Sequence, residues 1–157
     1  MIDTSVLVDN LIATLRDIPA LVEEMAGDPH RIFAYHDQYP KQVSLSHAIH
    51  TMPAPSIMAA WQGTAPGSFG GFDVWKHSIT LYVRARETYD GDPPTPYYRI
   101  FRLITKGVPT QSGQPMLNTE IHPNCHPMDL PLIQRQTDAE GLDYFEVPIT
   151  FTEIGDD

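Results

Sequence analysis

The sequence predicts an α+β domain in which an antiparallel or mixed β-sheet carries an N-terminal helix and one inserted helix packed on one face. Three observations predict this class. An amphipathic helical pattern opens the chain, a long alternating strand pattern lies in its middle, and two shorter strand patterns follow a second helix. The chain has 157 residues, of which 41% are hydrophobic, so we expect a single domain over residues 1–157.

The opening helix is predicted over residues 3–26, where apolar residues recur at spacings of three and four. Asp3 or Thr4 supplies the N-cap, and Gly27 ends the helical pattern. Pro19 cannot join the backbone hydrogen-bond ladder, so we expect a kink or a break there.

The next part of the chain is rich in proline and glycine, and it gives weaker signals. Residues 31–35 are short and apolar, as expected of a first strand, whereas residues 36–71 are assigned mainly to loop. Within that segment, residues 57–62 have the composition of a buried strand. Residues 63–71, GTAPGSFGG, have that of a mobile surface loop.

The clearest strand pattern covers residues 72–86, where one face is expected to be core and the other polar and solvated. The polar face includes Thr80, Arg84 and Arg86. Because strands usually have about 3 to 10 residues, we expect this strand to protrude beyond the sheet or to bend.

A helix is then predicted from Thr95, its N-cap, to Gly107, with Pro96 in the first turn. Residues 130–136 and 144–154 form a closing hairpin. Pro148 lacks an N–H, which places the last strand at an edge or at a bulge.

Charge and composition exclude several classes of function. With 10 Lys and Arg against 20 Asp and Glu, the formal net charge is −10, which disfavours tight binding to DNA or RNA. Neither a membrane-spanning apolar run nor a signal peptide is recognised, so we expect a soluble, unprocessed protein. The single cysteine cannot form an internal disulfide, as is typical of proteins that fold in the cytoplasm.

A metal site is the main chemical alternative, because His122, Cys125 and His126 offer nitrogen and sulfur donors within five residues. A zinc site needs further ligands, and the sequence has no second pair of Cys or His residues at the spacing of zinc ligands. We therefore prefer a loop with incidental histidines. His47 and His50 are interpreted as surface or interface residues. Hydrolase, Walker A and dinucleotide motifs are not found, and we therefore expect no cofactor and no enzymatic activity.

Aromatic residues flank the glycine-rich segment. Trp61 and Trp75 are expected in the core, on strands. Phe69 has little apolar company in the sequence and is a candidate anchor for a partner, because exposed aromatic residues are enriched at interfaces.

Four segments in their order along the chain carry a resemblance: the helix at 4–26, the strand FDVWKHSITLYVRAR, the helix TPYYRIFRLITKG and the ending YFEVPITFTEIGD. This arrangement resembles the tail-terminator, or tail-completion, proteins of long-tailed bacteriophages. The resemblance covers nearly the full chain but includes no diagnostic motif. The proline-rich segment 36–71 departs from the smallest members of the family.

The resemblance implies a structural virion protein assembled in the host cytoplasm. Six copies would form a ring on the tail-tube protein, stop tube growth and present the surface to which head-to-tail neck proteins attach. DNA would only pass through the ring, and an acidic channel would keep it from sticking. No membrane is involved.

Exposed strand edges and loops are the expected contacts between copies, since an edge lets a neighbour extend the sheet. Five residues are the candidates for this interface: Phe69, Arg84, Arg86, Asp90 and Asp92. Three other functions remain open. The chain could be another head-to-tail connector, which the helix at 95–107 disfavours, a small metal-binding domain, or a ligand-binding domain with an apolar pocket.

Overall fold

The computed structural model describes residues 1–39, 42–85, 95–107, 125–129, 133–137 and 143–153. The side chains of residue 69, residues 95–96, residues 105–107 and residues 125–129 also lie outside the description. Among the described residues, no helix is long and apolar enough to cross a membrane.

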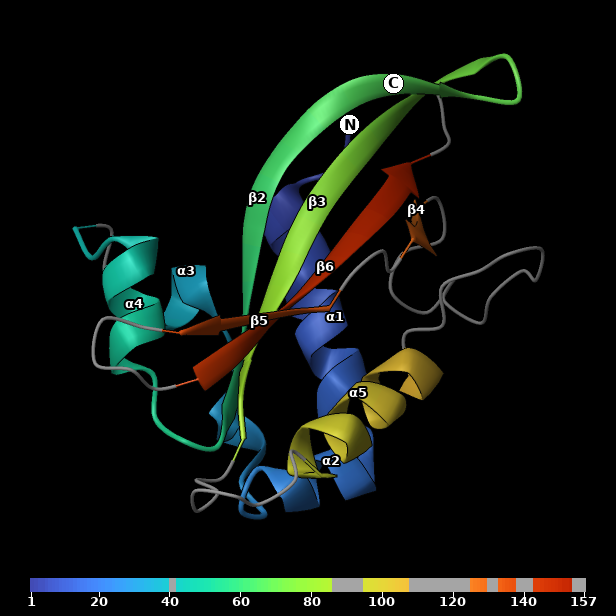
Figure 1. The fold of residues 1–157 in the computed structure, drawn as a ribbon. Helices are drawn as coiled ribbons and strands as arrows, with labels where there is room; N and C mark the ends of the chain where they lie inside the picture. Colours follow the sequence, from blue (N-terminus) through green and yellow to red (C-terminus); the bar gives the residue numbers. More distant parts are fainter. Residues whose placement is uncertain (40–41, 86–94, 108–124, 130–132, 138–142, 154–157) are drawn as a thin grey trace.

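One mixed β-sheet organises the described residues, in the strand order β1-β2-β3-β6-β4 (Figure 1). Its strands are β1 (Ile32–Ala34), β2 (Ser56–Phe69), β3 (Phe72–Arg84), β4 (Cys125–Asp129), β5 (Gln134–Thr137) and β6 (Asp143–Glu153). β1 runs parallel to β2, and the other pairs are antiparallel. β4 and β5 pair with different parts of β6 along the same side. The predicted α+β class is confirmed.

Three helices cover one face of the sheet: α1 (Thr4–Arg16), α2 (Pro19–Glu24) and α5 (Thr95–Gly107). The Asp3 carboxylate caps α1 by accepting a hydrogen bond from Ser5 N at 2.9 Å. The predicted break occurs at Pro19, which occupies the first turn of α2. α5 packs on β6 through Tyr97 and Phe145, whose ring centroids lie 4.3 Å apart. The predicted positions of the N-terminal and inserted helices are therefore confirmed.

The opposite face is also covered, which the sequence analysis did not predict. A short 3₁₀ turn (Pro29–Arg31) leads into β1, and α3 (Tyr35–Gln38) and α4 (Leu45–Thr51) follow in the segment assigned mainly to loop. The Ser44 hydroxyl caps α4 by accepting from His47 N at 3.1 Å. A second apolar cluster results, formed by Phe33, Ala48, Ile49, Met52, Met58, Ala60 and Tyr82.

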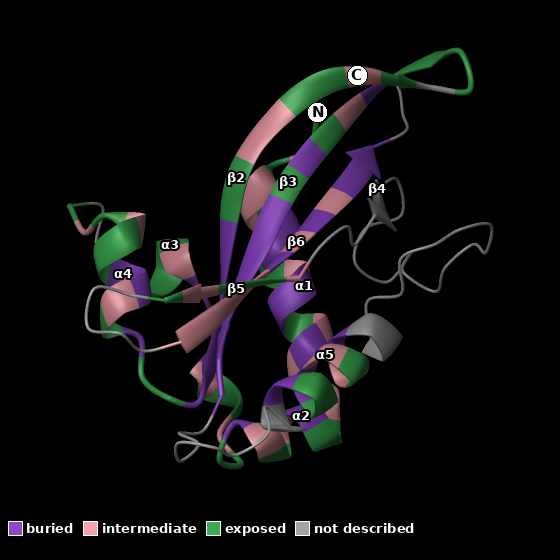
Figure 2. Ribbon diagram, viewed as in Figure 1, coloured by how far each residue is buried: buried purple, intermediate pink, exposed green. Residues whose placement is uncertain are grey.

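This second cluster corrects the prediction of a wholly polar face on the long strand. Every residue from Ile79 to Arg84 is buried, on both faces of β3 (Figure 2). Thr80 and Arg84 are therefore buried although the alternation placed them in solvent. The reason is that the second cluster, with α3 and α4, covers the face that alternation alone assigns to water.

The segment 63–71 is likewise not a mobile loop. β2 continues through Phe69, and each residue from Gly63 to Phe69 pairs with a residue of β3. Gly70 and Gly71 have φ of +59° and +86°, which suits a two-residue hairpin turn in which both central residues adopt positive φ. The composition is typical of a loop, but the neighbouring strand supplies hydrogen-bond partners that composition does not reveal.

The hairpin of β2 and β3 projects beyond the rest of the sheet (Figure 1). Pairing of β3 with β6 begins at Trp75 and Glu153, so residues 72–74 extend past the end of β6. The predicted protrusion is confirmed. Pro148 lies on β6 between the residues paired with β5 and those paired with β4, where its missing N–H removes no ladder bond to either strand.

Candidate assembly surface

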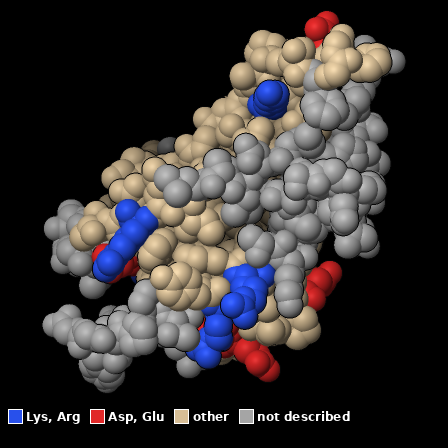
Figure 3. Space-filling model, turned by 45° about the vertical axis from the view of Figure 1, so that its right-hand side comes forward, with Lys and Arg blue, Asp and Glu red and all other residues tan. Residues whose placement is uncertain are grey.

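The β2–β3 hairpin carries two exposed aromatic side chains, one at its projecting tip and one further down, opposite Ile79 where β3 is already paired with β6. Phe72 is 71% exposed beside the turn, and Trp61 is 49% exposed where the β2 register shifts between residues 61 and 63. Figure 3 shows this projecting end as mainly uncharged surface, with few basic or acidic side chains. Exposed aromatic side chains on a rigid hairpin are suited to anchoring a protein partner.

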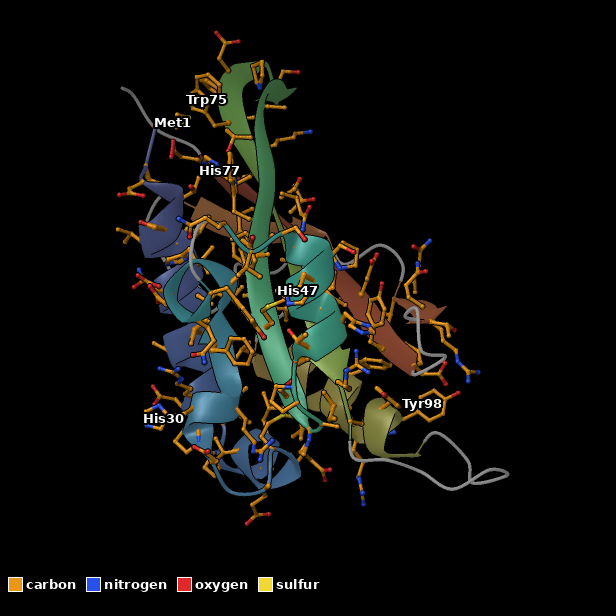
Figure 4. All side chains as sticks on the ribbon, turned by 90° about the vertical axis from the view of Figure 1, so that its left-hand side faces the viewer. Met1, His30, His47, Trp75, His77 and Tyr98 are labelled. Atoms are coloured by element: carbon orange, nitrogen blue, oxygen red, sulfur yellow. The ribbon has the colours of Figure 1, made fainter. Side chains whose placement is uncertain are left out.

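The base of the hairpin is held by a chain of polar contacts. The indole Nε1 of Trp61 donates to Thr64 Oγ1 at 3.0 Å, and Thr64 Oγ1 lies 2.8 Å from His77 Nδ1. His77 is completely buried on β3 and lies near the start of the chain (Figure 4). These contacts fix the orientation of the Trp61 ring at the surface.

The outer edge of β2 adds a second feature to this surface. β1 pairs only with Ile57, Met58 and Ala59, so residues 60–69 have no strand partner on that side within the described residues. The segment AWQGTAPGSF contains no Lys, Arg, Asp or Glu. Edge strands are usually protected by charged residues, whereas this one has Pro66 and the register shift between residues 61 and 63 as protective devices.

A hollow of about 250 Å³ opens where this edge begins. It lies between the first turns of α1, the start of α3 and β2. Its lining residues are Thr4, Ser5, Val8, Tyr35, His36, Ala60 and Trp61. An apolar side chain from a partner on the β2 edge would have space there.

The predicted interface residues are not all on this surface. Phe69 ends β2 and its backbone pairs with Phe72, but its side chain lies outside the described residues. Arg86, Asp90 and Asp92 also lie outside them. Only Arg84 is fully described, and it corrects the prediction of an exposed contact.

Arg84 is 4% exposed, and its Nη2 donates to the carbonyl of Ile49 at 2.9 Å. Its guanidinium carbon lies 5.9 Å from the ring centroid of Tyr144. The side chain therefore ties β3 to α4 and to β6 within the subunit. It is exposed to a partner only if α4 moves away.

Sequence reasoning missed Trp61 and Phe72. Trp61 was expected in the core, and that prediction is wrong, whereas Trp75 is half-buried. The charge-free run of residues 60–69 was the available signal, because a solvated strand edge normally carries charge. Phe72 and Phe69 flank the hairpin turn, and Phe69 is the residue that the sequence indicated as a candidate anchor.

Two further groups of polar residues lie elsewhere. An open groove of about 630 Å³ runs between α4 and the strands β5 and β6, and its lining includes His47, His50 and Tyr144. Figure 4 shows His47 on α4. The histidines predicted at a surface therefore border this groove.

The second group lies at the start of α3. His36 Nε2 is 3.2 Å from an Asp9 oxygen and 3.3 Å from an Asp37 oxygen, and all three side chains are exposed. Partial burial raises the pKa of Asp9, the negative charge of Asp37 raises it further, and His36 opposes both effects. Of the predicted metal ligands, His122 lies outside the described residues, and only the backbones of Cys125 and His126 are described, as the start of β4.

No protein-family model matches the sequence, and no curated protein does. The interpretation of the surface therefore depends on its geometry and on the resemblance in element order.

Proposed function

We propose that this chain is a ring-forming structural protein of the tail-terminator type. Six copies close on the last ring of a phage tail tube, end its growth and present the surface to which the neck proteins of the head attach. The observation that carries the proposal is the projecting β2–β3 hairpin, with Trp61 and Phe72 exposed and one backbone edge free among the described strands.

A projecting hairpin suits a ring because it presents one surface to a different surface of the next copy. Such head-to-tail contacts close into a ring when the rotation between copies permits it. The exposed rings of Trp61 and Phe72 would be buried in the contact, and aromatic residues often dominate interface energies. The formal net charge of −10 is compatible with a channel that DNA crosses without binding.

The size of the purified protein, measured by light scattering across a concentration series and by electron microscopy, tests this proposal. We expect rings of six copies. Trp61→Ser and Phe72→Ser should each shift the population toward monomers, with the thermal midpoint of the monomer unchanged. Tyr98→Ser is the matched control, because Tyr98 is 64% exposed but lies on α5, away from the hairpin. A protein that stays monomeric, even when mixed with tail tubes, would refute the proposal.

The α4 groove favours a second candidate, a ligand-binding domain. Its volume of about 630 Å³ and its polar side chains His47, His50 and Tyr144 suit a small polar molecule. A thermal-shift screen of small metabolites against the wild type and His47→Ala tests it. A stabilising compound that loses its effect in the variant, found for a strictly monomeric protein, would favour this candidate over the ring.

A further inference from the structure

The sheet ends in two different edges, and each presents backbone groups to solvent. On one side, β2 has no described strand partner from residue 60 to residue 69. On the other side, β5 pairs with β6 through Gln134–Thr137, and no described strand pairs with its outer side. A row of unpaired N–H and C=O groups is complementary to another β-strand.

The two edges can pair with each other because neither carries an unpaired charge. The β2 edge is uncharged over ten residues. On β5, the only charged residue is Arg135, which is ion-paired within the subunit to Asp143 of β6. Neither edge therefore brings an unpaired like charge to the contact.

We propose that neighbouring copies join by extending the sheet, with the β2 edge at residues 60–69 of one copy paired to the β5 edge of the next. This inference rests on the proposed ring. Pairing of a β2 edge with a second β2 edge is isologous and closes a two-fold dimer, whereas pairing of two different edges is heterologous and can continue around a ring. A ring therefore selects the second arrangement.

The surroundings of the β2 edge support a strand at this position. β1 stops opposite Ala59, where the chain turns into α3, so an incoming strand would pair with the part of β2 that extends past α3. The hollow of about 250 Å³ beside Ala60 and Trp61 gives space for one of its side chains. The exposed face of Trp61 would be covered at the same time.

Cross-linking between copies tests the pairing. Cys125→Ser removes the single native thiol, and Ala65→Cys or Gln134→Cys then places one thiol on an exposed residue of either edge. The two single variants are mixed and treated with a short bifunctional maleimide, which tolerates small differences in register. We expect a linked pair containing one copy of each variant, and in the double variant a ladder that ends at the ring. Tyr98→Cys mixed with Gln134→Cys is the control and should not link.

Light scattering on the same samples separates the failure of this inference from failure of the proposed function. Rings that form without the mixed cross-link would overturn the edge pairing, and other contacts would then have to hold the ring together. Efficient cross-linking of Ala65→Cys to a second copy of itself would also overturn it, because that result indicates a two-fold dimer. Samples that contain only monomers, both alone and when mixed with tail tubes, would refute the ring and the pairing together. Ala65→Lys, which adds a charge to the edge, should abolish the ring while the far-ultraviolet circular dichroism stays unchanged.

Discussion

His77 Nε2 on β3 lies 3.4 Å from Glu153 Oε1 on β6, and the two side chains are 0% and 5% exposed. The same carboxylate oxygen accepts a hydrogen bond from the backbone N–H of Ile2 at 2.6 Å. On its other side, His77 contacts Thr64 of β2. One buried pair thus connects two neighbouring strands with the segment that leads into α1, at the level where the hairpin leaves the sheet.

Removing either partner of this pair is expected to destabilise the protein. Glu153→Ala leaves the buried His77 imidazole without the carboxylate beside it, whereas His77→Ala leaves Glu153 with the N–H of Ile2 as a donor. Each change should lower the free energy of unfolding by about 1 to 3 kcal/mol. In the double variant the loss should be smaller than the sum of the two by at least about 1 kcal/mol, because the interaction can be lost only once. Urea unfolding of the four proteins measures this difference.

A matched control lies nearby on the same two strands, one residue from His77 and three residues from Glu153. Ser78 and Thr150 are directly opposite each other, and neither is buried. Ser78→Ala and Thr150→Ala should have additive effects. Additive effects at His77 and Glu153, within about 0.5 kcal/mol, would contradict an energetic coupling between them.

Arg84 is expected to stabilise the subunit itself. Arg84→Met leaves the carbonyl of Ile49 without a charged donor, and we expect a loss of about 2 to 3 kcal/mol in unfolding free energy. Arg84→Glu buries a negative charge in the same place and should prevent folding. Urea unfolding and circular dichroism measure both effects. An Arg84→Met protein that unfolds like the wild type but assembles poorly would instead place Arg84 in an interface.

The alkaline stability of the protein should depend on Tyr82. Burial, and to a lesser extent the nearby Glu146, raise the pKa of the Tyr82 hydroxyl to about 12, although the hydrogen bond from Gln62 opposes the rise. The unfolded chain releases this proton near pH 10, before the folded protein does, so stability should fall as pH rises from about 10 to about 12, by about 2 to 3 kcal/mol in total. Tyr82→Phe should remove that part of the fall, as measured by urea unfolding at each pH. An unchanged profile in Tyr82→Phe would contradict the prediction, and Tyr98→Phe on the surface is the control.

Asp37 is expected to influence the titration of Asp9 across the contact between α1 and α3. Because the pKa of Asp9 is raised in the folded protein, the folded state holds the proton more tightly than the unfolded chain, whose Asp9 has the ordinary pKa of 3.8. The stabilising contribution of the bound proton is therefore lost as the pH rises from 3.8 through the raised pKa of the folded protein. Asp37→Asn should lower the pKa of Asp9, as followed by carboxyl-carbon NMR. Asp17→Asn, beyond the end of α1, is the control and should not change it. An unchanged Asp9 titration in Asp37→Asn would show that partial burial alone causes the rise.

Local patterns predicted the elements whose residues interact mainly with their neighbours in the sequence. The Asp3 cap, the break at Pro19 and the α5 helix follow from capping, proline geometry and helical periodicity. The length of the β3 pattern also predicted that this strand protrudes beyond the sheet. The missed elements are the short helices α3 and α4, the strand β4 in a stretch that was interpreted as loop, and the end of β2. Their local signals are weak, and packing or strand pairing forms them.

Periodicity and composition were enough to predict the α+β class, the N-terminal and inserted helices on one face, and a strand too long for the sheet. The coverage of the second face by α3 and α4, the burial of Arg84 and the exposure of Trp61 became visible only in the folded arrangement. The physical reason is that alternation shows which residues of a strand share a face, whereas solvent exposure depends on what distant segments place over that face. For the same reason, the pairing of His77 with Glu153 has no signal in the sequence around either residue.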